Sequence, residues 1–453
     1  MAKAINQRIA KNILHVLAGG TVPDNGLQYI AVGRRDEVEA FTRDMDKIEE
    51  GYSTFRLLEG PYGSGKSFMS KLIKNEALLR GFVVLECELA PERKLCGTKR
   101  EGLETYKCLM AKASTRTCPT GGALEELLDG YLYSLEEQAR QPGLPERAQQ
   151  NGRTEEEEVC EEVLLSCASL RKLIENLPHG FDFYHVFCRY ARSWVTHDED
   201  GVAAAMRWFR GEYQTKTEAK RALQASDIVT DENWFSYIKI WAVLVREIGY
   251  QGLYVILDEL TQITRNITNA ITREHNFERL LSMYNDCYGS DARYMGIVLC
   301  GIPSSIHDTK RGIFSYEALR SRLDVSKLQG SELYNSPIIK LSMLTKEEFV
   351  ALIGKLDAMY AMVHQGEQET YFSEEEQIAF VTYEYRRIAA ANHLTPREFI
   401  RDFLTILDLK ATSRPQDGMR EFLGGGIHMT ESMIGAGERE SAAGAGKYEN
   451  FSL

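Results

Sequence analysis

Three features are scarce or missing in this 453-residue sequence, and each absence excludes a class of protein. No run of about 18 apolar residues occurs, so we expect no helix that spans a membrane. The nine cysteines are an odd number without a C-x-x-C pair, which argues against a disulfide framework and favours a reducing, cytoplasmic location. Basic residues do not predominate: the net charge of −12 gives no electrostatic support for a broad nucleic-acid-binding surface, although local patches matter more than totals.

Two local patterns resemble a metal site and a targeting signal, but simpler explanations fit them better. His185 and Cys188 come nearest to a metal-binding pair, yet they lie in the aromatic stretch FDFYHVFCRYARSW with no second pair nearby. Structural zinc sites need four ligands, so core packing is the better interpretation. The N-terminal stretch MAKAINQRIAKNILHVLAGG has apolar residues at helical spacing, broken by polar ones, which predicts an amphipathic helix rather than a signal peptide.

A glycine-rich loop is the strongest motif in the sequence. Residues 57–72 read LLEGPYGSGKSFMSKL and contain the pattern G-x-x-x-x-G-K-S. The stretch before the loop, STFRLLEG, is typical of a buried strand, and the stretch after it, SFMSKLIKNEALLRG, is typical of a helix that ends at Gly81. A strand, a glycine loop and a helix in this order form the arrangement that cradles nucleotide phosphates.

The residue types in the loop suit phosphate and Mg²⁺ binding. Glycines allow tight turns that point several backbone N–H groups inward, and the N-terminus of the following helix adds partial positive charge. Lys66 can reach the outer phosphates, and the hydroxyl of Ser67 can ligate Mg²⁺. We therefore predict nucleotide contacts from Gly60, Pro61, Tyr62, Gly63, Ser64, Gly65, Lys66, Ser67 and Phe68.

A second motif, LYVILDE at 253–259, is the expected partner of the glycine loop. Its near-continuous apolar run predicts a strand buried on both faces, which ends in Asp258 and Glu259. We expect Asp258 to hold Mg²⁺, directly or through water, and Glu259 to orient and deprotonate an attacking water. An ordinary strand that ends in acidic residues would explain this motif alone, but the two motifs in this order favour the functional interpretation.

The rest of the chain predicts an α/β fold. GFVVLECELAPE indicates a second strand at 81–89, and RYMGIVLCGIPSSI at 293–306 contains another. We expect a P-loop core of three α/β/α layers with a mostly parallel sheet, a helical insertion and an all-helical lid. Within the insertion, six glutamates at 155–162 indicate a solvated face or loop. The predicted segments are an N-terminal helix and loop (1–30), a nucleotide-binding domain (31–344, insertion at about 100–225), a lid (345–412) and a flexible tail (413–453).

Several stretches together resemble a known group of ATPases. GRRDEV before the first strand, SRL at 321–323 and TPREFI at 395–400 resemble segments of AAA+ ATPases of the origin-recognition and STAND-like branch. More narrowly, IAVGRRDEV, GPYGSGKSF, YQGLYVILDEL and GIFSYEALRSRL resemble the ATP-binding proteins of BREX-type bacteriophage-defence systems, over roughly residues 5–90 and 230–410. The resemblance implies ATP and Mg²⁺ as cofactors, Gly33 and Arg34 on the adenine side, homo-oligomers, and other defence proteins as partners in a complex on DNA. Direct DNA contact stays open.

The resemblance also assigns roles to three arginines. Arg322 resembles an arginine finger that reaches the γ-phosphate bound by a neighbouring subunit, with Arg320 as an alternative on the same helix end. Arg397, which follows Pro396, resembles a lid arginine that touches the γ-phosphate in cis. In each case the alternative is an arginine that lies on the solvated surface of a helix and contacts no phosphate.

One departure from the pattern concerns hydrolysis. Ile302 stands near the place where Thr or Asn would position the attacking water, and Ser304 is the nearest substitute.

The main hypothesis is an ATPase in a defence complex. The alternatives are a nucleotide-gated switch or scaffold with little turnover, and a DNA-loading, replication-initiator-like ATPase. A small-molecule kinase fits least, because the lid and the arginines suit a ring or filament.

Overall fold

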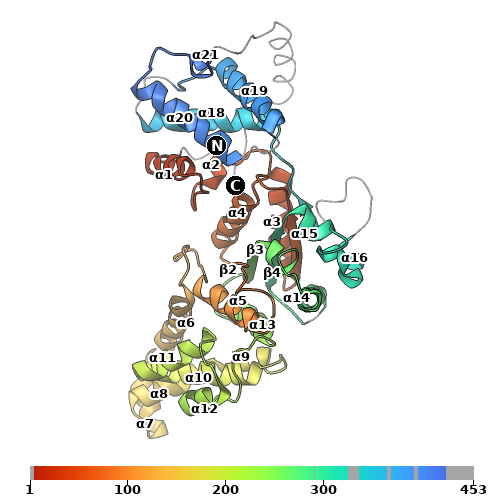
Figure 1. Cartoon of the computed structure of the whole chain (residues 1–453). Coiled ribbons are helices and arrows are strands. Elements are labelled where there is room, and N and C mark those ends of the chain that lie inside the picture. The colour runs from red at the N-terminus through yellow and green to blue at the C-terminus, as the bar shows by residue number, and fades with distance from the viewer. Residues whose placement is uncertain (1–4, 290, 325–335, 365–368, 392–395, 425–453) are drawn as a thin grey trace. The chain divides into compact units, whose positions relative to one another are not determined.

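The computed structural model describes residues 5–289, 291–324, 336–364, 369–391 and 396–424 (Figure 1). Contacts divide the chain into two compact units. Unit 1 comprises Met1–Ala40, Glu59–Asn75 and Lys340–Leu453, and unit 2 comprises Phe41–Leu58 and Glu76–Ile339. This division groups residues differently from the consecutive segments expected above, whose boundaries stay predictions. Each unit is described by itself.

A five-stranded parallel sheet forms the centre of the α/β fold. Its strands are β1 (Ser53–Glu59), β2 (Val83–Glu88), β3 (Leu253–Asp258), β4 (Met295–Gly301) and β5 (Ile338–Lys340). The order across the sheet is β2-β3-β4-β1-β5, so β4 separates the strand before the glycine loop from the strand that ends in Asp258. Every residue of β1 and β4 is buried, as parallel strands covered on both faces require.

The strands predicted from apolar runs are confirmed, with one addition. Predicted strands at 81–89, at LYVIL and within 293–306 correspond to β2, β3 and β4. β5 was not predicted, because three residues are too few to show a strand period. Its pairing with β1 is shown by hydrogen bonds from the Leu57 amide to the Pro337 carbonyl oxygen and from the Leu341 amide to the Glu59 carbonyl oxygen, both 2.7 Å.

Helices fill the chain between β2 and β3 in unit 2. They are α5 (Glu101–Ala111), α6 (Leu124–Ala139), α7 (Leu144–Asn151), α8 (Glu155–Ser166), α9 (Ala168–Ile174), α10 (Gly180–Val195), α11 (Glu199–Phe209), α12 (Lys216–Leu223) and α13 (Trp234–Glu247). The glutamate run occupies α8, whose first turn is closed by a capping box between Thr154 and Glu157. His185 lies on α10 and bonds to the Leu223 carbonyl oxygen at 3.0 Å. Among the described residues, no group of His, Cys, Asp or Glu is arranged to hold a metal ion.

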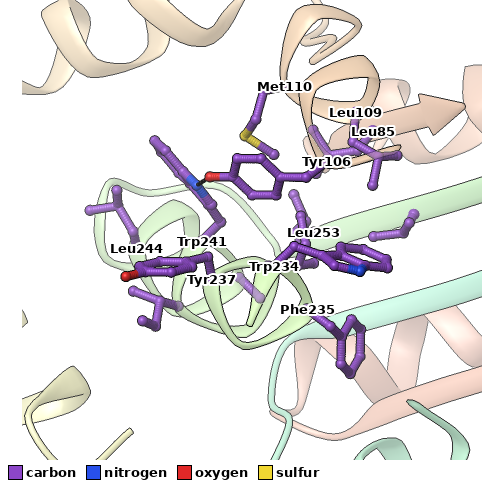
Figure 2. Close-up of a cluster of buried hydrophobic side chains, with 14 of the residues drawn as sticks. Leu85, Tyr106, Leu109, Met110, Trp234, Phe235, Tyr237, Trp241, Leu244 and Leu253 are labelled. Atoms are coloured by element: carbon purple, nitrogen blue, oxygen red, sulfur yellow. Dashed lines mark hydrogen bonds between the residues drawn. The ribbon is translucent and has the colours of Figure 1, made fainter. Parts of the chain in front are cut away.

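The core of unit 2 joins the sheet to this insertion through aromatic side chains (Figure 2). The indole nitrogen of Trp234 donates to the Leu95 carbonyl oxygen at 2.9 Å. The indole nitrogen of Trp241 donates to the Tyr106 hydroxyl at 3.1 Å. These bonds satisfy the polar tips of large rings, whose burial contributes about 1.5–3 kcal/mol for each side chain. The insertion therefore shares one core with the sheet.

Unit 2 also contains the elements that follow β3 and β4. They are the 3₁₀ helix η1 (Leu260–Ile263), α14 (Ala270–Tyr288), α15 (Pro303–His307), the 3₁₀ helix η2 (Ile313–Ser315) and α16 (Glu317–Leu323). Helix α3 (Arg35–Glu49) begins in unit 1 and ends in unit 2. A buried ion pair between Asp44 and Arg56 ties α3 to β1, with 2.7 Å between Asp44 Oδ1 and Arg56 Nη2.

Unit 1 combines both ends of the chain with the glycine loop. Its helices are α1 (Gln7–Ala18), α2 (Leu27–Ile30), the first part of α4 (Lys66–Leu79), α18 (Lys346–Val363), α19 (Glu374–Ala391), α20 (Pro396–Thr412) and α21 (Met419–Phe422). The helical character predicted for the N-terminus and for residues after 345 is confirmed. Phe399 packs against Phe349 and Phe380 at ring-centroid distances of 4.3 Å and 5.1 Å, so aromatic contacts join α18, α19 and α20.

Two expectations concern the membrane and the tail. No helix in the described ranges is both long and apolar enough to cross a bilayer. Most of the tail predicted at 413–453 lies outside the described residues, and its described part contains α21.

Candidate functional site

The glycine loop of unit 1 has a backbone that requires glycine. Gly63 and Gly65 have φ of +81° and +89°, in the left-handed region that side chains disfavour. A Cβ at Gly60 would stand 2.2 Å from Ser64 Oγ. That hydroxyl oxygen is buried without a hydrogen-bond partner in the described part of the chain. Helix α4 begins at Lys66, so backbone N–H groups and the positive end of the helix dipole lie beside the loop. The loop can therefore offer donors to an anion.

Lys66 and Ser67 stand where the loop meets the helix. Lys66 Nζ donates to the carbonyl oxygens of Gly60 at 2.8 Å and Pro61 at 3.0 Å, and lies 5.5 Å from the centroid of the Tyr62 ring. Ser67 is exposed. An ammonium bonds more strongly to a phosphate than to neutral carbonyl groups, so Lys66 can exchange these partners for a ligand.

Arg34 is a buried residue that is hydrogen-bonded to the glycine loop. This arginine is only 4% exposed. Its Nη2 donates to the Ser64 carbonyl oxygen at 2.9 Å and to the Ser342 carbonyl oxygen at 2.8 Å. Its Nη1 pairs with Glu37 at 3.4 Å. Burial raises the pKa of Glu37, and the Arg34 charge opposes that shift. The family resemblance placed Arg34 on the adenine side of the nucleotide site, which stays a prediction. Its bonds support a role in holding the loop.

Gly33 is packed against the start of α18, the first helix of the predicted lid. Its φ is +62°, and a Cβ there would stand 1.8 Å from Glu348 Oε1. Glu348 belongs to the capping box that begins α18. Lys355, seven residues further along α18, donates to the Ala31 carbonyl oxygen at 2.8 Å. The segment that contains Gly33 is thus attached to α18 at two points.

Arg397 lies in the second position of α20 and is exposed. A Cβ at Gly20, whose φ is +74°, would stand 3.4 Å from Arg397 Cγ and 3.3 Å from Arg401 Cδ, so both arginine stems pass close to Gly20. Sequence reasoning did not identify Arg401, although its i+4 spacing from Arg397 places both on one helix face.

The segment after Gly20 is bound to α4. Lys71 Nζ donates to the Val22 carbonyl oxygen and to Asp24 Oδ1, both at 2.6 Å. Asn75 donates to the Asp24 carbonyl oxygen at 2.8 Å. One short segment therefore connects the glycine-loop helix to the position of the predicted lid arginine. Its polar contacts were missed from the sequence, because they depend on residues about 50 positions apart.

In unit 2, β3 ends in a strained acidic turn. Asp258 Oδ1 accepts a hydrogen bond from the Glu259 amide at 2.7 Å, and the Asp258 carbonyl oxygen accepts one from the Leu89 amide at 3.0 Å. Glu259 adopts φ 63° and ψ 51°, a left-handed conformation that is uncommon for residues other than glycine. Such backbones cost about 1–3 kcal/mol and cluster at functional sites. Both carboxylates are half-buried.

Two serines after β4 contact the segment that follows Glu259. Ile302 precedes α15 and carries no polar group. The Ser304 hydroxyl accepts a hydrogen bond from Arg265 Nη1 at 2.8 Å. The buried Ser305 hydroxyl shares one with Thr261 at 3.2 Å. Ser304 was considered from the sequence, whereas Ser305 was missed. These bonds connect the end of β4 to the residues after the acidic turn.

The two predicted finger arginines differ in their surroundings. Arg322, on α16, is half-buried: its Nε donates to Asn285 Oδ1 at 3.1 Å, and its Nη1 donates to the Ala318 carbonyl oxygen at 2.8 Å. Arg320 is exposed on the same helix. The roles of both stay predictions.

Most of the chain matches a known protein family. The family model described as BREX system ATP-binding protein BrxC/D matches residues 5–422, which include the glycine loop, the acidic turn and all three arginines. No curated protein matches the chain.

Proposed function

Since the chain belongs to the family of BREX system ATP-binding proteins, we propose that it is a Mg²⁺-dependent AAA+-type ATPase that acts in a multi-protein defence complex on DNA. The proposal adds hydrolysis, magnesium and DNA to the ATP binding that the family establishes. One observation carries the enzymatic part: Glu259, the expected general base, occupies a strained left-handed backbone at the end of a buried strand.

We assign phosphate binding to the glycine loop and α4. The loop glycines leave room for close approach, and the N-terminus of α4 adds partial positive charge that favours an anion. Lys66 moves from the loop carbonyls to the outer phosphates. Arg34 keeps the loop in shape through the Ser64 carbonyl oxygen. These features fit a nucleoside triphosphate better than a sugar or a peptide, because a cluster of backbone N–H groups with an ammonium suits a polyanion.

Hydrolysis requires the acidic turn of β3. We assign Asp258 and the Ser67 hydroxyl as Mg²⁺ ligands. Bound Mg²⁺ would neutralise charge on the β- and γ-phosphates. Glu259 would accept a proton from the attacking water. The strand order supports the assignment: β1, which leads into the glycine loop, and β3 are parallel strands of one sheet with β4 between them. Carboxyl ends of parallel strands meet at one edge of a sheet, where α/β proteins bind ligands.

The arginines extend the proposal to a homo-oligomer. Arg322 or the more exposed Arg320 would stabilise transition-state charge at a neighbouring subunit, and Arg397 would do so in cis. Arg322 already has partners in its own chain, so Arg320 is the freer candidate for a neighbour.

ATP hydrolysis by the purified protein tests the proposal, with and without duplex DNA. We expect Glu259→Gln to lower turnover by about 100-fold or more while ATP binding persists, because a positioned base contributes about 10²–10⁴-fold. Glu274→Gln, which changes an exposed acid of the same unit, is the matched control. Turnover that survives in Glu259→Gln would refute the assigned base. Stimulation by DNA would support the action on DNA.

A second candidate function is a nucleotide-gated switch with little turnover. It is favoured by the apolar Ile302 after β4 and by the engagement of the Ser304 hydroxyl with Arg265. The same assay separates the two functions: tight ATP binding without measurable hydrolysis, in the presence and absence of DNA, would select the switch.

A further inference from the structure

A cavity of about 460 Å³ in unit 2 is lined by α14 and by residues 96–98, which precede α5. Its volume is within the range of about 300–1,000 Å³ that is typical of small-molecule sites. From α14 it receives Thr272, His275, Arg279 and Ser282, whose spacing of three, four and three residues places them on one helix face. The helix therefore presents a continuous polar face to the cavity.

Residues 96–98 form a second wall, which buried side chains hold in place. Asn276 is fully buried and bonds to Cys96 twice: its Oδ1 accepts from the Cys96 amide at 3.3 Å, and its Nδ2 donates to the Cys96 carbonyl oxygen at 3.1 Å. The buried Asp231 accepts a hydrogen bond from the Gly97 amide at 2.8 Å. The wall is thus preformed, so a ligand would not have to order this segment on binding.

Arg279 is the residue that indicates a ligand in this cavity. It is half-buried on α14, yet its guanidinium makes no hydrogen bond or ion pair with any residue that the structure describes. Two other half-buried arginines of unit 2 do have partners: Arg273 donates to the Ile267 carbonyl oxygen at 2.8 Å, and Arg322 donates to Asn285 at 3.1 Å. Cations that are partly removed from water are normally paired, so the free donors of Arg279 favour an anionic group in the cavity.

The other charges of the cavity decide what kind of ligand fits. Glu232 and Glu278 also line it, and within the described ranges neither carboxylate has an ion-pair partner. Asp231 is already bonded to backbone amides, and burial raises the pKa of Cys96 to about 11, so that thiol is neutral at pH 7. With histidine neutral, one positive and two negative charges are left for a ligand. A phosphate would add further negative charge, whereas a ligand with one carboxylate and two cationic groups complements all three.

We propose that this cavity binds a basic α-amino acid, such as lysine or arginine. Its carboxylate pairs with Arg279, because a guanidinium presents two parallel donors that match a carboxylate. Glu278, the neighbour of Arg279 in the chain, accepts from the α-ammonium, and Glu232 accepts from the cationic end of the side chain. Hydroxyl groups of Thr272 and Ser282 lie on the same helix face and offer further hydrogen bonds. The proposal does not depend on nucleotide binding or hydrolysis.

Isothermal titration calorimetry of the full-length protein with L-arginine and L-lysine tests the proposal. For at least one of them we expect one site per chain with a Kd below about 1 mM. Agmatine, which is arginine without its carboxylate, should bind at least about tenfold more weakly, because it cannot pair with Arg279. L-glutamate and inorganic phosphate should bind more weakly still. No binding of either basic amino acid, or tighter binding of glutamate or phosphate, would overturn the proposal.

Substitutions then assign the contacts. Arg279→Gln should weaken binding of the basic amino acid at least about tenfold without weakening agmatine, because only the contact with the carboxylate is lost. This arginine has no bond within the described chain to lose, so urea unfolding of the variant should match wild type. Glu232→Gln and Glu278→Gln should each weaken the amino acid and agmatine alike. Arg293→Gln, at an exposed arginine that does not line the cavity, is the matched control. Unchanged amino-acid affinity in Arg279→Gln, or an equal loss in Arg293→Gln, would refute the site.

Discussion

The Arg34 guanidinium donates a hydrogen bond to the carbonyl oxygen of Ser64, 2.9 Å away, in the middle of the glycine loop. A second bond from the same nitrogen reaches the Ser342 carbonyl oxygen, so one buried side chain joins the loop to the segment before the predicted lid. Arginine suits this position because its donors have a rigid geometry and it stays charged.

Removal of Arg34 should therefore weaken both the loop and the fold. In Arg34→Ala, two carbonyl oxygens and the buried Glu37 lose their partner, which should cost at least about 2 kcal/mol of unfolding free energy. We expect ATP affinity to fall as well. Urea unfolding and equilibrium ATP binding measure the two effects. Arg35→Ala, at the exposed neighbouring arginine, should change neither.

Substitutions at Glu259 should separate the effect of its backbone strain on stability from the effect of its carboxylate on hydrolysis. Glycine adopts left-handed backbone without strain, so Glu259→Gly should raise the unfolding free energy relative to Glu259→Ala by about 1 kcal/mol. Both variants lack the carboxylate and should lose hydrolysis. Chemical denaturation beside an ATPase assay tests this pair. Equal stability of the two variants would argue against strain at this residue.

The contact between Ser305 and Thr261 should position the acidic turn. Ser305→Ala leaves the buried Thr261 hydroxyl without this partner, which should cost about 1–3 kcal/mol. Because the bond lies two residues after Glu259, we expect kcat to fall more than KM changes. Ser166→Ala, at an exposed serine of α8, is the control for steady-state kinetics. A fall in stability with unchanged kcat would leave Ser305 a purely structural role.

The finger arginine should act in trans. Arginine fingers contribute about 10³–10⁵-fold to turnover, so the correct Arg→Ala variant should be nearly inactive alone. When it is mixed with Lys66→Ala, which keeps its arginine but loses its own nucleotide, activity should partly return. Arg320→Ala and Arg322→Ala, tested in parallel, identify the finger. Failure of both mixtures would contradict a site shared between subunits.

The lid arginine can be distinguished from its neighbour. Arg397 and Arg401 both pass close to Gly20, so packing is common to the two side chains. If Arg397 contacts phosphate in cis, Arg397→Ala should slow ATP hydrolysis by about tenfold or more, whereas Arg401→Ala should have a small effect. Equal losses in both variants would indicate that the arginines act only by packing on Gly20.

Much of the local structure followed from the sequence. The glycine loop, the helix after it and the apolar strands β2, β3 and β4 appear where composition and periodicity predicted them. The family resemblance was also confirmed. The short strand β5 and the contacts of Ser305 were not predictable, because neither leaves a periodic signal in neighbouring residues.

By itself, the sequence determined which segments become strands and helices and which loop can hold a phosphate, because those properties depend on residues close together in the chain. Only the tertiary structure decided how the functional side chains are held. Arg34 meets a carbonyl group 308 residues away, and the indole nitrogen of Trp234 meets the Leu95 carbonyl oxygen 139 residues away. Such contacts depend on which faces of the elements are buried together, and local sequence patterns do not specify that choice.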